Sequence, residues 1–260
     1  MCLLAVLYRL VPESPILVAG NREEYYDRPA QPPSIQSGKP RVLCGLDQRA
    51  GGTWLGVNQH GMFVGLTNRR TANGESIGSR SRGLIAREVL RSITARQGVD
   101  KTVEEMSNHQ YEPFNLIVCD SESGWVVYNN GEQSEVQPLE EGLNIIGNFN
   151  LNDPADERVQ LANRLLTLQN LDSPVKFLAV ASKVFARTPT PAGRASMVIR
   201  NHDYGTISST LIALSPKPRD AIFQYSAGAP DESKYEDYSP MLRDILSRGL
   251  REARSKVKAG

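Results

Sequence analysis

The chain has 260 residues, 40% of them hydrophobic, and its 30 Lys and Arg residues nearly balance 29 Asp and Glu residues, for a formal charge of +1. This balance gives no overall electrostatic reason to bind nucleic acid or an anionic membrane, and no run reaches the ~18–20 apolar residues that span a bilayer. No Ser/Gly-rich or Pro-rich tract is long enough to be a linker, so we expect a single domain over residues 1–260.

The chain opens with Met1-Cys2 and two apolar segments, residues 2–10 and 16–19, separated by Val11-Pro12-Glu13-Ser14-Pro15. This pattern predicts a strand, a turn and a second strand. Antiparallel pairing brings the end of the second strand beside the start of the first, so residues 21–24 should lie close to Cys2. A carboxylate and a guanidinium there could orient the α-amine and hold an anionic group of a substrate.

Cys2 combines two reactive groups once Met1 is removed. A free α-amine titrates near pKa ~7.7–8.0 and a thiol near ~8.5, so the amine can take the proton of the thiol at neutral pH. We expect Met1 to be removed because cysteine is small. The alternative is that Cys2 is a buried apolar residue of the first strand.

The following segments predict a loop and a hairpin. Residues 25–41 are polar and rich in proline, which is typical of a surface loop, and residues 45–52 predict a turn. Strands are expected at 53–57 and 62–67, joined by a tight turn at 58–61. Asn68 ends the second strand and either caps the next turn or aims its amide into a site.

Two further groups of residues follow. Arg69 and Arg70, with Arg80 and Arg82, form a local basic cluster that either receives an anionic group or forms a solvated rim. Asn148 follows an apolar segment and either supports a site or belongs to a turn.

The rest of the chain predicts helices and strands in alternation. Helices are expected at 82–96 with Ser81 as N-cap, at 101–108, at 154–168 with Asp153 as N-cap, after Ser173-Pro174 to 185, and at 240–254. Strands are expected at 114–119, 124–128, 134–136, 142–147 (apolar enough to be central), 204–214 and 221–225. The basic end, residues 251–258, predicts a frayed, solvated tail without a partner.

Cysteine and histidine usage argues against a metal site. None of these residues has the spacing of metal ligands. The odd number of cysteines and the lack of a signal peptide favour a reducing, cytoplasmic compartment. The residues concerned are Cys2, Cys44, Cys119, His60, His109 and His202.

Several motifs resemble the NRDE family, also known as the transport and Golgi organisation family, over residues 1 to about 225. They are Met1-Cys2, Asn21-Arg22-Glu23-Glu24, Arg28-Pro29-Ala30, residues 51–58 with Trp54, Thr67-Asn68, and Tyr204-Gly205-Thr206. Glu23 departs from the aspartate of the family motif. The family is similar to the choloylglycine hydrolases and other N-terminal-nucleophile hydrolases. The resemblance therefore implies an α+β fold, a four-layer αββα sandwich of two antiparallel sheets between two helical layers.

The resemblance also implies roles for individual residues. Cys2 would be the nucleophile, Glu24 would orient its α-amine, and Asn68 and Asn148 would hold the oxyanion. Hydrolases of this kind carry Gly-Arg-x-x-Asp after the first hairpin, and here the arginine position holds Asn21. Arg22, one residue on, would point to the opposite face of the strand. The expected substrate contacts are Asn21, Arg22, Trp54, Arg69 and Arg70.

Two functions remain open at this point. The first is a cysteine hydrolase or acyltransferase that acts on an amide or thioester bond of a small molecule and requires no cofactor. The second is a non-catalytic carrier of haem, or of an acyl-CoA or lipid. Arg69 and Arg70 would then bind the haem propionates, and Cys2 or His202 would be the axial ligand. We expect neither nucleic acid nor integral membrane contact in either case.

Overall fold

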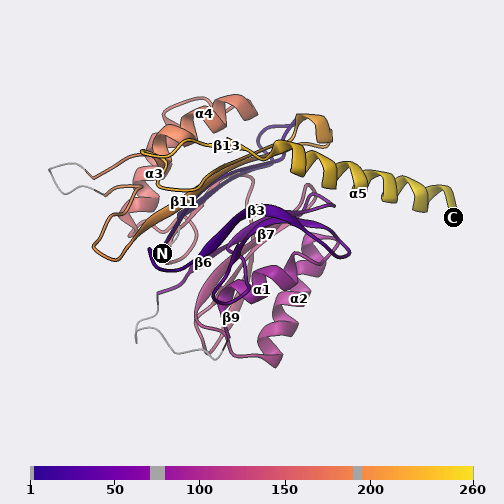
Figure 1. Ribbon diagram of the computed structural model, residues 1–260, viewed down its shortest axis with the longest axis horizontal. Coiled ribbons are helices and arrows are strands. Elements are labelled where there is room, and N and C mark those ends of the chain that lie inside the picture. The colour runs from indigo at the N-terminus through magenta and orange to yellow at the C-terminus, as the bar shows by residue number, and fades with distance from the viewer. Residues whose placement is uncertain (1–2, 71–79, 190–194, 260) are drawn as a thin grey trace.

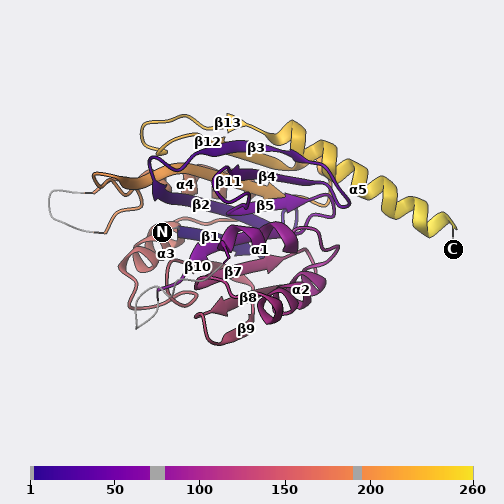
Figure 2. The ribbon, with the colours of Figure 1, turned by 60° about the horizontal axis from the view of Figure 1, so that its bottom comes forward.

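The computed structural model describes residues 3–70, 80–189 and 195–259, with side chains up to Ser255. Two antiparallel sheets face each other in the middle of the molecule, and helices cover the outer face of each (Figure 1, Figure 2). This arrangement confirms the predicted α+β sandwich.

The first sheet contains both amino-terminal strands. Its described strands lie in the order β10-β1-β2-β11-β12-β13. Their bounds are β1 Leu3–Tyr8, β2 Ile16–Tyr25, β10 Gly142–Ile146, β11 Tyr204–Leu214, β12 Ile222–Ser226 and β13 Glu236–Asp237.

The second sheet follows the order of the chain from β3 to β9, each strand pairing with the next. Its bounds are β3 Ala30–Gln36, β4 Val42–Asp47, β5 Leu55–Asn58, β6 Phe63–Asn68, β7 Phe114–Cys119, β8 Gly124–Asn129 and β9 Ser134–Pro138.

Alternating side chains of the strands build three apolar layers. Leu4 and Val6 of β1 point between the sheets, while Leu3 and Ala5 point to the outer helices, because neighbouring residues of a strand face opposite sides. Helices α3 (Glu157–Thr167) and α4 (Pro174–Phe185) cover the first sheet, and α1 (Arg82–Val89) and α2 (Ala95–Asn108) cover the second.

Helix α5 (Ser239–Ala259) closes one end of the sandwich. Its buried residues Leu242, Ile245 and Leu246 join the apolar layer between the sheets, and the short 3₁₀ helix η1 (Pro218–Asp220) packs beside it. Both views show the carboxyl-terminal part of α5 projecting away from the sheets (Figure 1, Figure 2). Within the described ranges, no helix combines the length and the apolar character needed to cross a membrane.

Strand β2 is longer than predicted and contains the Asn21-Arg22-Glu23-Glu24 motif. The expected strand ended at Ala19, but β11 pairs with β2 along its whole length, from Leu214 opposite Ile16 to Tyr204 opposite Tyr25. The polar motif is therefore held by a strand from the other end of the chain, which a local pattern does not reveal.

The predicted loop at 25–41 is wrong, because this segment contains β3. The strand lies at the edge of its sheet, and Pro32 and Pro33 fall where the register shifts between Gln31 and Ser34. Proline is tolerated at edges and bulges because the missing N–H group is not needed there. The predicted turn at 45–52 also overlaps a strand, since β4 continues to Asp47.

Several other boundaries differ from those predicted. Helix α1 stops at Val89, and α2 starts at Ala95 because the side chain of Thr94 caps it by accepting from the Gln97 N–H. Asp156, rather than Asp153, caps α3. Strand β10 is an edge strand rather than a central one, and α5 continues to Ala259 where a frayed tail was expected.

Candidate functional site

The NRDE-type motif divides its side chains between the two faces of β2. Gly20 lies opposite Leu4, which points between the sheets, so Arg22, two residues on, faces the second sheet. The Arg22 guanidinium lies 4.4 Å from the ring centroid of Trp54, and its side chain is only 6% exposed. The expectation that Asn21 occupies the cleft side and Arg22 the opposite side is wrong, because the pairing of Leu4 with Gly20 fixes the reverse.

Asn21 and Glu23 instead face the outer helical layer. The Asn21 amide donates to the backbone oxygens of Phe185 and Met197, at 2.9 and 3.0 Å. Glu23 forms an ion pair of 2.9 Å with Arg158 of α3. Burial raises the pKa of the Glu23 carboxyl, and the Arg158 guanidinium opposes this rise. These contacts anchor the motif to the helices, and the predicted substrate contact of Asn21 stays a prediction.

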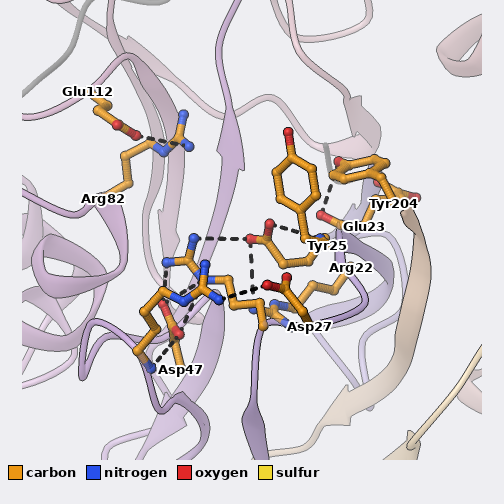
Figure 3. Close-up of polar contacts among 11 residues, drawn as sticks. Arg22, Glu23, Tyr25, Asp27, Asp47, Arg82, Glu112 and Tyr204 are labelled. Atoms are coloured by element: carbon orange, nitrogen blue, oxygen red, sulfur yellow. Dashed lines mark hydrogen bonds and ion pairs between the residues drawn. The ribbon is translucent and has the colours of Figure 1, made fainter. Parts of the chain in front are cut away.

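Glu24 and Arg28 join Arg22 in a network of ion pairs that extends to Asp47; Figure 3 labels Arg22 and Asp47 in this region. The Glu24 carboxylate lies 3.9 Å from Arg22 and 3.6 Å from Arg28. Arg28 also donates to both oxygens of Asp47, with a shortest distance of 2.6 Å. Burial is the largest single influence and would raise the pKa of Asp47, but the hydrogen bonds and charge of Arg28, together with the Arg49 N–H and the charge of Arg22, outweigh it and lower that pKa.

Asn68 and Asn148 are brought together, but they use their amides differently. The Asn148 side chain is buried, and its Nδ2 donates to the Asn68 backbone oxygen at 2.8 Å. The backbone oxygen of Asn148 accepts from the Arg70 N–H at 2.9 Å. Asn68 is half-buried at the end of β6 and lines the cleft described below. Asn148 therefore fixes the end of β6 from the segment that follows β10.

Arg69 points away from this region. Its guanidinium donates to Asn115 and Asn150, at 2.9 and 2.7 Å, and lies over the ring of Tyr128. The Arg70 side chain is exposed. Neither arginine lines the cleft, and their predicted contact with a ligand stays a prediction.

A cleft of about 230 Å³ lies where β2, β4 and β6 meet the start of α1. Six side chains that line it are Arg22, Glu24, Arg28, Asp47, Trp54 and Asn68. Arg82 and Glu112 lie at its far side as an ion pair of 3.0 Å (Figure 3). Most of the lining is charged, and most of the charges are paired with one another.

Glycines bring the walls of the cleft together. A Cβ atom on Gly52 would collide with the backbone of Gly83, and the Thr53 N–H donates to the Gly83 oxygen at 2.9 Å. A Cβ atom on Gly45 would collide with the indole ring of Trp54. The start of α1 and the Trp54 ring therefore reach the cleft only because these positions lack side chains.

Arg28, Asp47 and Glu112 were not among the site residues predicted from the sequence. Arg28 stands in a quoted motif, but Asp47 was assigned to a turn and Glu112 follows a helix without any motif. Their positions depend on pairing between strands and on the approach of α1. The local signal was a charged residue near the end of a strand. Such a residue does not reveal which distant residue its charge pairs with.

The remaining reactive residues lie elsewhere or outside the described ranges. Cys2 is outside them. Cys44 and Cys119 are buried, and burial raises the pKa of both thiols, to about 11 for Cys44. His60, His109 and His202 do not line the cleft. Across the described residues, no three His, Cys, Asp or Glu side chains are grouped so that they could hold a metal ion.

Comparisons with known proteins agree with this architecture. The family model described as Transport and Golgi organisation 2 matches residues 1–223. The Transport and Golgi organization protein 2 homolog of Bos taurus is 29% identical over 253 residues, which cover 85% of this chain and 90% of the relative. The corresponding Mus musculus homolog is 27% identical over 256 residues, with the same coverages.

A solved structure shares the fold. The Caenorhabditis elegans ortholog of N-acylethanolamine-hydrolyzing acid amidase matches with a TM-score of 0.55 and 17% identity, over 89% of this chain and 98% of that chain. The likeness at this identity concerns the fold, which is that of the N-terminal-nucleophile hydrolases.

Proposed function

The chain belongs to the Transport and Golgi organisation 2 family, and from this premise we propose that it is a hydrolase or acyltransferase of the N-terminal-nucleophile type. Its substrate would carry an amide or thioester bond, and Cys2 would be the nucleophile. The fold supports the reaction type, and the geometry of the cleft supports the assignment of residues.

One observation carries the proposal: the start of β1 lies at the cleft. Leu3, the first described residue, pairs with Asn21 of the motif. Leu3 also shares a small void with Arg22 and Trp54, both of which line the cleft. The first described residue of the chain therefore lies beside the cleft in which we propose that a substrate binds.

The proposed reaction begins with proton transfer from the Cys2 thiol to the α-amine of the same residue. The thiolate attacks the carbonyl carbon, and the C=O bond becomes an oxyanion in a tetrahedral intermediate. The α-ammonium group returns the proton to the leaving nitrogen or sulfur, and the C–N or C–S bond breaks. Water, or another nucleophile in acyl transfer, then releases the acyl group from Cys2 by the same steps.

Asn68 is the proposed donor to the oxyanion. Its side chain makes no hydrogen bond within the described part of the chain, so its amide is available, and such a donor contributes about 3–4 kcal/mol in a transition state. Asn148 would act through Asn68, because its own Nδ2 is engaged by the Asn68 backbone. We therefore assign Asn148 a positioning role.

Arg22 is the proposed partner of the Cys2 thiolate. The Arg22 Nη1 atom is buried and has no hydrogen-bond partner among the residues that the structure describes, a costly state for a charged group. A thiolate nearby would satisfy it and would be stabilised in return. Glu24 lies between Arg22 and Arg28, so besides its proposed role at the α-amine it would hold Arg22 in place.

The alternative function, a carrier of haem or of an acyl-CoA or lipid, stays a prediction. No observation in the described cleft favours it over the enzyme, because Trp54 and Leu66 are the large apolar side chains among mostly charged lining residues. A haem titration of the purified protein tests it directly. A carrier would show a saturable Soret shift that is lost in a Cys2→Ala or His202→Ala variant.

The enzyme proposal is tested by turnover of a panel of chromogenic amides and thioesters. The wild type is expected to lack Met1 by intact mass and to turn over at least one substrate, while Cys2→Ala is inactive. Cys2→Ser keeps the fold and the α-amine with a poorer nucleophile, so it should retain a small fraction of the activity. Equal activity in wild type and Cys2→Ala would refute the proposal.

A further inference from the structure

Helix α5 carries a local excess of positive charge. Between Arg243 and Lys258 the sequence has six Lys and Arg residues against two acidic ones, whereas the whole chain has a formal charge of only +1. The remainder of the chain is therefore net acidic. The near-neutral total conceals a basic segment at one end.

Part of this charge is unpaired and exposed. Arg248 pairs with Asp244 at 3.0 Å, and Glu252 accepts from Gln59 at 2.7 Å. Arg251 and Arg254 are exposed and form no ion pair with any residue of the described ranges. Both belong to the carboxyl-terminal half of α5, and Figure 2 shows the carboxyl-terminal part of this helix projecting away from the sheets.

An apolar groove of about 300 Å³ lies beside the same part of α5. Leu246, Leu250 and Ala253 line one side, and they share a helix face because they are spaced by three or four residues. Ile16, Leu214 and Pro216 line the other side. Leu250 is 40% exposed, and Lys217 stands exposed at the rim next to Pro216.

From this combination we propose that α5 and the adjacent groove dock the protein onto the surface of an anionic lipid bilayer. Basic residues beside an apolar face are the features by which a helix lies in a membrane interface without crossing it. A second copy of the chain is a poorer occupant, because it would bring two basic α5 helices together. The unpaired cations favour a surface of opposite charge, and the apolar residues of the groove favour contact with hydrocarbon.

The proposal is independent of the proposed enzyme activity. The groove is lined by Ile16, the first residue of β2, whereas the cleft is lined by Arg22 and Glu24 near its other end. The groove and the cleft therefore lie at opposite ends of this strand.

Sedimentation with vesicles tests the docking surface. The full chain is expected to bind vesicles of phosphatidylcholine and phosphatidylserine, to bind pure phosphatidylcholine far more weakly, and to dissociate at high salt. The double variant Arg251→Gln/Arg254→Gln should lower the partition coefficient about 30-fold, since each basic residue near such a surface contributes about five-fold. The matched control Arg164→Gln/Lys183→Gln removes the same charge from exposed positions of α3 and α4 and should bind like the wild type.

The apolar contribution is tested with Leu250→Ser. This variant should bind phosphatidylserine vesicles more weakly while keeping the salt dependence of the wild type, and its thermal midpoint should change little because the side chain is partly exposed. Failure of the wild type to bind phosphatidylserine vesicles at low salt would overturn the proposal. An equal fall of the vesicle partition coefficient in the α5 double variant and in the α3/α4 control would also overturn it. Binding to polyglutamate without binding to vesicles would replace the bilayer with an acidic protein partner.

Discussion

Arg22 is the residue on which the site depends most. It is buried against Trp54, it faces the space between the sheets, and within the described residues its counter-charge is Glu24, at 3.9 Å. A guanidinium that is desolvated and incompletely paired attracts a further anion. In our proposal, this anion is the Cys2 thiolate.

Replacing Arg22 by glutamine should raise the pKa of the Cys2 thiol and slow its alkylation at pH 7 by about ten-fold, the effect of about one pKa unit. The measurement is the rate of iodoacetamide labelling of the amino-terminal peptide as a function of pH. Cys44 is the internal reference, because a thiol with a pKa of about 11 is almost entirely protonated at neutral pH. Arg69→Gln is the matched control, since Arg69 is engaged by Asn115 and Asn150. A labelling rate that does not change in Arg22→Gln would contradict the role of Arg22.

At the scale of elements, the contact between β4 and Trp54 positions the floor of the cleft. Gly45→Ala should destabilise the protein by about 1–3 kcal/mol, because the added methyl group would collide with the indole ring. In a Trp54→Phe background the smaller ring leaves room, and the loss should be smaller. Urea unfolding of the wild type, the two single variants and the double variant measures this coupling. If Gly45→Ala lowers the free energy of unfolding equally in both backgrounds, the added methyl group collides with a residue other than Trp54.

The ion pair between Asp47 at the end of β4 and Arg28 in the turn between β2 and β3 should make stability depend on pH. The pKa of Asp47 is lowered in the folded protein, so its contribution is complete above the unfolded value of about 3.9 and is lost as the pH falls through the folded value. Asp47→Asn should cost about 2 kcal/mol at pH 7, allowing for the partial exposure of Arg28. The difference from wild type in urea unfolding should shrink below pH 4. A difference that stays constant down to pH 2 would exclude this ion pair as its source.

The sequence predicted those elements whose signals are local. The hairpin of β5 and β6, the strands β7 and β8, and the helix after Ser173-Pro174 (α4) were all expected from turn residues and apolar patterns. Strand β3 and the full length of β2 were not predicted, because their own residues lack a local strand pattern. Pairing with β4 and β11, respectively, holds them in the sheets. For the same reason the motif residues were found, but the face on which Arg22 lies was assigned incorrectly.

At the scale of the molecule, the sandwich has two ends with different properties. One end holds a charged cleft beside the start of β1, and the other is closed by α5 and bears an apolar groove with a basic rim. Family membership and fold follow from the sequence and the comparisons, whereas the choice of a substrate depends on the side chains that line the cleft. Those residues, with Arg28, Asp47 and Glu112 among them, come from segments far apart in the chain.

The most direct test of the central claim is the location of an acyl adduct. The protein is incubated with acyl thioesters of increasing chain length, quenched in acid and mapped by peptide mass spectrometry. We predict a single acyl group on the peptide that begins with Cys2, formed faster than any modification of Cys44 or Cys119, and absent in Cys2→Ala. An amino-terminal peptide that stays unmodified, or that still begins with Met1 in an active protein, would contradict the claim that Cys2 is the nucleophile.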